Sequence, residues 1–245
     1  MLGFEREEWY MKHYIEPLDY SERAYDFIEG GVEQLKRRVV GGLKVDWAWE
    51  GGWTLIHCAV NNDDMGCLQF LLDHNGPLNH ASKQGQTPLH WAAFFGNEKA
   101  VQLLLDNGAN VDAIDCHGRN PLMWAVSMTD MDSNEANISC LQQLLEKGSD
   151  IGLCDGSGRT VLHYAAGTQC DERGCALEFL LRNGAAYHIN NIIDKEDKDR
   201  LTPLCCVHRS NHEMEHSKLL TDWSTAVQAK KSGVQDEVSP MPRYP

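Results

Sequence analysis

The stretch Thr87-Pro88-Leu89-His90-Trp91-Ala92-Ala93 returns in altered form along most of this 245-residue chain. Four further tetrapeptides match its first four residues: Thr54-Leu55-Ile56-His57, Asn120-Pro121-Leu122-Met123, Thr160-Val161-Leu162-His163 and Thr202-Pro203-Leu204-Cys205. In chain order, the five tetrapeptides begin 33, 33, 40 and 42 residues apart. A period of this length indicates that the chain is built from stacked structural repeats.

Each residue of the repeat has a physical role in a pair of short helices. Thr at the start of the first helix offers an oxygen to unpaired backbone N–H groups, and Pro suits the first helical turn. The small Ala pair lets adjacent units approach closely. A Leu-rich run such as Leu103-Leu104-Leu105 predicts the second helix, and Gly108 ends it with a positive φ. One unit cannot bury its own apolar face, so stability must come from stacked neighbours.

This pattern resembles the ankyrin repeat family, and residues 82–114 match it nearly residue for residue. The resemblance covers roughly residues 19–223. It implies an all-α solenoid of helix-turn-helix units joined by β-turn fingers. It also implies non-catalytic protein binding through the concave groove that the fingers and inner helices form, so we expect no enzyme and no cofactor.

The repeat divides the chain as follows: an N-terminal extension (1–18), a degenerate capping repeat (19–48), repeats at 49–81, 82–114, 115–154, 155–196 and 197–223, and a disordered tail (224–245). In the cap we expect helices over residues 24–28 and 32–40. The longer spacings predict inserts: a solvated loop at 128–139, a second at 168–174, and a third at 188–196. Inserts in repeat proteins map to surface loops, where they are either binding elements or tolerated drift.

Charge narrows the class of partner. Lys and Arg number 22, against 36 Asp and Glu, which gives a net charge of −14. This balance argues against nucleic acids and anionic membranes and favours a neutral or basic protein or peptide. The sequence predicts no transmembrane span and no secretory signal, so we expect a monomer in the cytoplasm or nucleus, with its nine cysteines reduced.

One motif suggests a different chemistry. His212-Glu213-Met214-Glu215-His216 fits the H-E-x-x-H pattern of zinc hydrolases, and His208 precedes it by four residues. The segment falls where the last repeat should turn between helices, so the two histidines need not share a helix. We therefore keep a zinc-dependent hydrolase as a minor alternative and assign no catalytic or metal-binding residue. No phosphate-binding loop and no nucleophile elbow occur.

Aromatic residues recur near the tetrapeptides. One aromatic surface could be formed by Trp53, Trp91, Phe94, Phe95, Trp124 and Tyr164, bordered by Asp63, Asp64, Asp130 and Asp132. Residues 89–94 are similar to a string in the ankyrin domains of certain histone lysine methyltransferases, which implies a methyl-lysine reader as an alternative function. Trp53 and Trp91 match that pattern, whereas Cys58 and Asn61 depart from it. The other interpretation is that Trp91, Trp124 and Tyr164 are core residues between repeats.

We expect the partner to contact residues on the fingers and inner helices, with Phe94 and Phe95 as the principal anchors because aromatic side chains dominate interfaces. The full predicted set is Trp53, Asn61, Asn62, Gln86, Trp91, Phe94, Phe95, Arg119, Trp124, Ser127, Arg159 and Gln169.

Overall fold

The computed structural model describes residues 30–127, 134–167, 176–183, 192–207 and 220–225. Its helices are α3 (Gly31–Val40), α4 (Leu55–Asn61), α5 (Met65–Asp73), α6 (Pro88–Phe94), α7 (Glu98–Asp106), α8 (Pro121–Val126), α9 (Asn134–Glu146), α10 (Val161–Gly167), α11 (Ala176–Arg182) and α12 (Pro203–Val207). Residues 220–225 are also helical.

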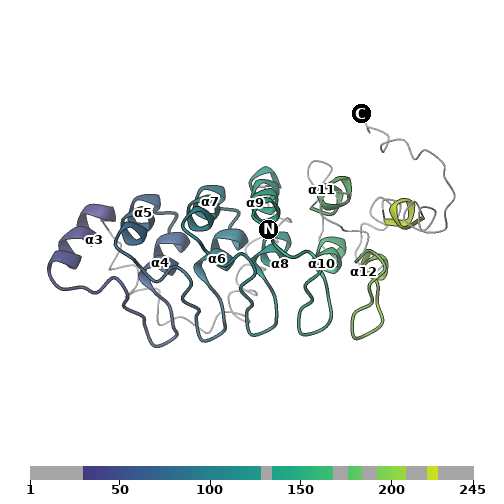
Figure 1. The fold of residues 1–245 in the computed structure, drawn as a ribbon, viewed down its shortest axis with the longest axis horizontal. Coiled ribbons are helices and arrows are strands. Elements are labelled where there is room, and N and C mark those ends of the chain that lie inside the picture. Colours follow the sequence, from purple (N-terminus) through teal and green to yellow (C-terminus); the bar gives the residue numbers. More distant parts are fainter. Residues whose placement is uncertain (1–29, 128–133, 168–175, 184–191, 208–219, 226–245) are drawn as a thin grey trace, which may run out of the picture.

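The helices form two parallel rows (Figure 1). The inner row is α4, α6, α8, α10 and α12, and each helix contacts the next. The outer row is α3, α5, α7, α9 and α11, joined in the same way, and the two helices of each repeat also contact each other. The described residues contain no strand, only one isolated bridge between Ala48 and Thr54. The predicted all-α solenoid is therefore confirmed.

The fingers between repeats project to one side in Figure 1. In three of them, the side chain of the first residue accepts hydrogen bonds from the backbone of the same finger. The Asp115 carboxylate accepts backbone N–H groups from His117 at 2.9 Å and Arg119 at 2.8 Å. Asp155 and Asp197 make the equivalent pair of bonds in the following fingers. Short polar side chains of this kind stabilise turns by imitating a backbone turn.

Each finger also bonds to the next one. The backbone N–H of Lys83 donates to the carbonyl of Gly51, and that of Cys116 donates to Gln84, both at 2.8 Å. Gly156 donates to His117, and Lys198 donates to Ser157. The fingers thus form a continuous backbone ladder, with one such bond between each neighbouring pair.

The ladder explains the glycine that precedes the last residue of four fingers. Gly52, Gly85, Gly118 and Gly158 have φ between +77° and +83°. A Cβ at Gly85 would lie 2.9 Å from the Cα of Asp115 in the next finger, and a Cβ at Gly118 would lie 3.0 Å from the backbone nitrogen of Gly156. These positions require glycine for the backbone conformation and for the close approach of the neighbouring finger.

Arg200 occupies this position in the last finger, with φ +59°. No further finger follows residues 197–201 in the described chain, so a side chain there has no neighbouring backbone to displace. Only the conformational cost remains, about 1 kcal/mol for a left-handed non-glycine residue. Arginine thus replaces glycine in the last finger of the described residues.

The structure corrects one predicted insert and leaves other segments undescribed. Helix α9 begins at Asn134, so residues 134–139 of the expected 128–139 loop are helical, and Asn137 is buried. Helix α3 confirms the helix expected at residues 32–40. The expected helix at 24–28, the 1–18 extension, the 168–174 insert, residues 188–191 of the third insert and residues 226–245 of the tail lie outside the described residues. Residues 192–196 of the third insert are described, and Ile192 and Ile193 are buried.

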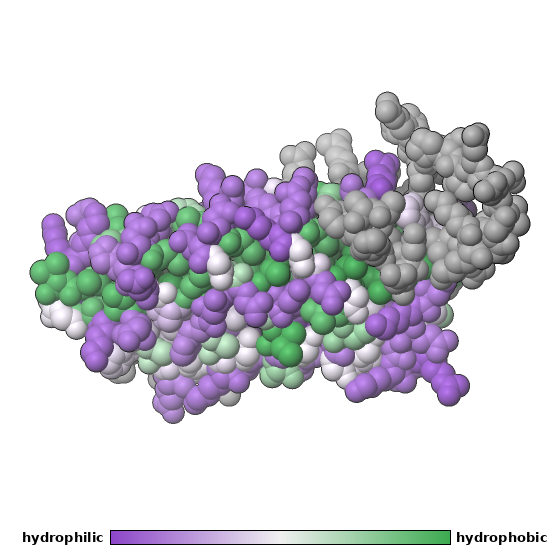
Figure 2. All heavy atoms as spheres, in the orientation of Figure 1, coloured by the Kyte–Doolittle hydropathy of each residue, from purple (hydrophilic) through white to green (hydrophobic). Residues whose placement is uncertain are grey.

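Hydrophobic side chains reach the surface at the α3 end of the solenoid (Figure 2). The exposed large apolar residues of the described chain are Val40, Trp47, Phe95 and Ile114. Within the same residues, no helix combines the length and apolarity needed to cross a membrane.

We predict that Gly85→Ala destabilises the protein more than Gly108→Ala. Both glycines have positive φ, +77° and +87°, but a Cβ at Gly108 would meet nothing within 4 Å. The Gly108 change should cost about 1 kcal/mol and the Gly85 change about 3 kcal/mol, because the next finger must also move. Urea denaturation followed by circular dichroism measures both losses. Equal losses would mean that the neighbouring finger yields without cost.

We predict that Arg200→Gly stabilises the fold. The substitution removes a left-handed arginine, and the net gain should be about 0.5 to 1 kcal/mol after the entropy cost of glycine. Lys198→Gly is the control, since Lys198 lies in the same finger but is not among the positive-φ residues. If both variants lose stability in urea denaturation, strain at Arg200 is not significant.

Candidate functional site

The first turn of each inner helix binds the neighbouring finger through a histidine. In α4, the Nδ1 atom of His57 accepts the backbone N–H of Thr54 at 3.2 Å and lies 2.9 Å from the Thr54 hydroxyl. The opposite nitrogen, Nε2, lies 3.1 Å from the carbonyl oxygen of Gln86. Since Nδ1 accepts, Nε2 carries the proton and donates to that carbonyl. His90 and His163 make the same bridges to Arg119 and Leu201.

These histidines are neutral structural groups. Burial lowers the pKa of His57 to about 3 and that of His90 to about 4, although the hydrogen bonds to Gln86 and Arg119 favour the charged form. Burial also lowers the pKa of His163. A histidine that stays uncharged at neutral pH and has both ring nitrogens engaged cannot serve as a general acid or base without breaking the contact between repeats.

In the third repeat, Asn120 and Met123 replace this pair. The side-chain oxygen of Asn120 accepts the backbone N–H of Met123 at 3.1 Å, and its amide donates to Asp112 and Ser149. The amide of Asn120 thus joins Asp112, at the end of the second repeat, to Ser149, at the end of the third, and does not bind the carbonyl of the following finger as the histidines do.

An Asp–Arg–aromatic triad links finger and helix in the third and fourth repeats. Asp115 Oδ2 accepts from Arg119 Nε at 2.7 Å and from Trp124 Nε1 at 3.1 Å. The guanidinium carbon of Arg119 lies 4.9 Å from the centre of the Trp124 ring. Asp155, Arg159 and Tyr164 repeat the arrangement, with the guanidinium carbon 4.8 Å from the ring centre.

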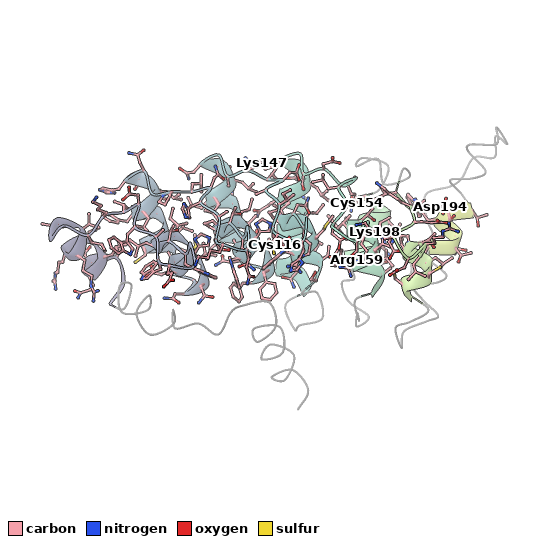
Figure 3. The ribbon with its side chains drawn as sticks, turned by 90° about the horizontal axis from the view of Figure 1, so that it is seen from below. Cys116, Lys147, Cys154, Arg159, Asp194 and Lys198 are labelled. Carbon is pink, nitrogen blue, oxygen red and sulfur yellow. The ribbon has the colours of Figure 1, made fainter. Side chains whose placement is uncertain are left out.

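The two triads differ in exposure. The side chain of Arg119 is 6% exposed and that of Arg159 is 44% exposed. Figure 3 views the solenoid from the side to which the fingers project, and Cys116, Arg159 and Lys198 are labelled there. Burial alone would raise the pKa of Asp155, but hydrogen bonds from Arg159 and Tyr164 outweigh burial and lower it. The fourth repeat therefore presents an accessible arginine whose charge is largely compensated by Asp155.

The second repeat lacks the charged members of the triad. Ser82 and Gln86 stand where Asp115 and Arg119 stand one repeat later. The ring of the second repeat, Trp91, is 1% exposed, and its Nε1 atom is buried without a hydrogen-bond partner. Its contacts are instead aromatic: the ring centre lies 5.0 Å from Trp53 and 5.7 Å from Phe95.

Trp53, Trp91 and Phe95 are called the aromatic patch below. Phe95 is 41% exposed at the end of α6, and Trp53 is partly exposed at the start of α4. Phe94 lies behind Phe95 with ring centres 5.3 Å apart, and it is 5% exposed. The patch is therefore an exposed aromatic surface supported by buried rings.

A carboxylate lies in the loop next to this patch. Asp63 is exposed and has φ +52°, at the position that Gly96 takes one repeat later. Its Oδ1 atom accepts the side-chain amide of Asn97 at 2.7 Å. Since Asn97 follows Phe95 by two residues, this bond holds the two loops side by side. Sequence analysis placed Asp63 at the border of the aromatic surface but missed the role of Asn97, which no local pattern signals.

The structure separates the predicted contact residues into accessible and buried groups. Those with exposed or partly exposed side chains are Trp53, Asn61, Asn62, Phe95, Ser127 and Arg159. Those that are buried are Gln86, Trp91, Phe94, Arg119 and Trp124. The buried group packs between repeats, which corrects the expectation that six aromatic residues form one accessible surface and that Phe94 is an anchor. Gln169, Asp130 and Asp132 lie outside the described residues.

The remaining sequence motifs supply no second site in the described chain. Burial raises the pKa of the Cys58, Cys67 and Cys140 thiols to about 12, so these cysteines are poor nucleophiles. All seven described cysteines are free thiols. No group of three or more His, Cys, Asp or Glu side chains within the described ranges could hold a metal ion. The His208, His212 and His216 cluster lies outside them.

Comparison with known proteins gives one family. A family model described as ankyrin repeats (3 copies) matches residues 29–115, 56–135 and 130–231. Together these matches extend from residue 29 to residue 231, which is most of the chain. No curated protein matches.

We predict that acid destabilises the solenoid through its buried histidines. Between pH 6.5 and about 4, the unfolded chain binds protons at His57 and His90 that the folded chain does not. Stability should therefore be nearly constant between about pH 7 and pH 8 and fall as the pH drops from 6.5, by up to about 1.4 kcal/mol per pH unit for each histidine. Melting temperatures measured from pH 7 to pH 5 test this.

The control copies the third repeat into the second, as Thr87→Asn with His90→Met. This variant should lose between about one third and one half of the pH dependence, because it removes His90 and keeps His57 and His163, of which His57 has the larger shift. A melting temperature that does not change between pH 7 and pH 5 would contradict the assignment.

Proposed function

We propose that this chain, which belongs to the ankyrin repeat family, is a non-catalytic adaptor that binds a partner protein through its inner helices and fingers. Ankyrin repeats are generally protein–protein interaction modules. The observation that supports a specific surface is the aromatic patch, where Phe95 remains 41% exposed although its neighbours Trp91 and Phe94 are buried. Exposed aromatic side chains held rigidly by a packed base are typical anchors of protein interfaces.

Two features support a binding role over an enzymatic one. The buried histidines and thiols are engaged in packing or shifted away from reactive pKa values. The charged Asp115–Arg119 and Asp155–Arg159 pairs are committed to finger structure. We infer a monomer in the cytoplasm or nucleus, in which the repeat surface is available to a different protein.

A methyl-lysine reader is less well supported. Such a cage needs several aromatic faces around one cation. Of the six aromatic residues considered for it, Trp91, Trp124 and Phe94 are buried, and Trp53, Phe95 and Tyr164 remain accessible. Tyr164 already contacts its own Arg159.

We predict that Phe95→Ala abolishes partner capture and leaves the melting temperature within about 4 °C of wild type, since the side chain is 41% exposed and its truncation should cost about 1 kcal/mol. Phe94→Ala should instead cost about 3 kcal/mol, because it empties a buried site. Thermal unfolding by circular dichroism separates the two effects. Capture is measured by affinity purification from lysate with mass spectrometry, followed by binding of the purified partner.

Val40→Ala is the matched control for this experiment. Val40 is 90% exposed at the α3 end, away from the aromatic patch, so its removal should change neither stability nor capture. If Phe95→Ala and Val40→Ala capture the same proteins as wild type, the aromatic patch is not the binding surface.

A further inference from the structure

We propose that Phe95 and Asp63 together bind a cationic side chain, arginine or lysine, carried by a partner segment that also contains aliphatic residues. This inference rests on the proposed function and specifies the chemistry of the partner. The occupant is a basic, apolar peptide segment of another protein.

The Asp63 carboxylate is held in place for such a contact. One oxygen is fixed by the Asn97 amide at 2.7 Å, and the backbone adopts φ +52°, which Asp tolerates better than most residues. The side chain is exposed, and no Lys or Arg of the described residues pairs with it. The neighbouring Asp64 is used differently, because its carboxylate caps helix α5 through the backbone N–H of Cys67.

The aromatic half of the site is Phe95. Its ring is supported by Trp91 and Phe94, with centres 5.7 Å and 5.3 Å away, so the exposed surface is rigid. A cation near an aromatic ring and a carboxylate gains from both, and these contacts strengthen as water is excluded.

Two intramolecular sites already combine an arginine, an aromatic ring and a carboxylate in this way. Arg119 lies over Trp124 and pairs with Asp115, and Arg159 lies over Tyr164 and pairs with Asp155. The first two repeats carry Trp53 and Gln86 at the arginine position. In the described residues, the half of the solenoid around α4 and α6 therefore has rings and a carboxylate but no arginine of its own beside them.

Charge and apolarity point to the same partner. The net charge of −14 attracts a basic segment over distance and raises its association rate. Trp53, in contact with Trp91, adds partly exposed apolar surface on the other side of the patch. That surface suits the aliphatic residues that flank the cation.

The test uses fluorescein-labelled peptides and anisotropy titration of the full-length protein. The probe is Gly-Leu-Arg-Leu-Arg-Leu-Gly, compared with the same peptide carrying Glu for Arg and with one carrying Gly for Leu. We expect the Arg–Leu probe to bind more tightly than both. Asp63→Asn, which keeps the bond from Asn97 and tolerates the backbone conformation, should weaken its binding by about threefold to tenfold, and Phe95→Ala by at least about tenfold.

Asp73→Asn is the matched control. Asp73 is an exposed carboxylate at the end of α5 on the outer row, so this variant has the same net charge as Asp63→Asn. Its affinity should stay within about twofold of wild type. Equal weakening by Asp63→Asn and Asp73→Asn would overturn the proposal in favour of general charge attraction, as would equal binding of the Glu peptide.

Two further outcomes separate this proposal from the proposed function. If the probe fails to bind while Phe95→Ala still abolishes capture of a purified partner, the basic chemistry is wrong and the binding surface stands. If neither the probe nor any partner depends on Phe95, the proposed function also fails. Binding that requires trimethyl-lysine in place of Arg would overturn the hydrogen-bonded pair with Asp63 and favour the reader alternative, because a quaternary ammonium keeps its charge but has no N–H to donate.

Discussion

The solenoid depends on contacts between repeats, since no single helix pair can bury its own apolar face. Two polar contacts add direction to this burial. The finger ladder contributes one backbone hydrogen bond from each finger to the next, and His57, His90 and His163 bind the carbonyl of the following finger. Both contacts fix how far and at what angle one repeat stacks on another. The hydrophobic effect alone would not, because it is non-directional.

This constraint explains which residues can vary. Glycine is required wherever another finger stacks, and arginine replaces it at Arg200, in the last finger of the described residues. Thr and His are replaced in the third repeat, where Asn120 caps its own helix and bonds to Asp112 and Ser149 instead of to the following finger. Residues that project from the ends of inner helices, such as Phe95, take no part in these contacts between fingers. Side chains at such positions can differ between repeats without weakening the stack, and they can therefore contact a partner.

The repeat made the fold predictable from sequence, because each of the five tetrapeptides independently indicates the start of an inner helix. Burial at individual positions was harder to predict. Phe94 and Phe95 are adjacent and chemically identical, yet one is 5% and the other 41% exposed. The difference depends on the rotation of α6 against the neighbouring helix α8, which carries Trp124, and the sequence period does not resolve that rotation to one residue. The start of α9 at Asn134 was missed for a related reason, because its first turn is polar and resembles a loop.

The contrast between the two halves of the solenoid has a physical consequence for binding. Around α8 and α10, each exposed or buried arginine is already paired with a carboxylate and a ring, so the net field there is small. Around α4 and α6, the same structural positions hold Trp53, Gln86 and Trp91, and the carboxylate of Asp63 lies outside the finger network. A partner must displace internal salt bridges to gain electrostatic energy in the first region and need not do so in the second. Selectivity for a cation should therefore be concentrated at one end of the repeat surface, even though the backbone repeats almost unchanged from end to end.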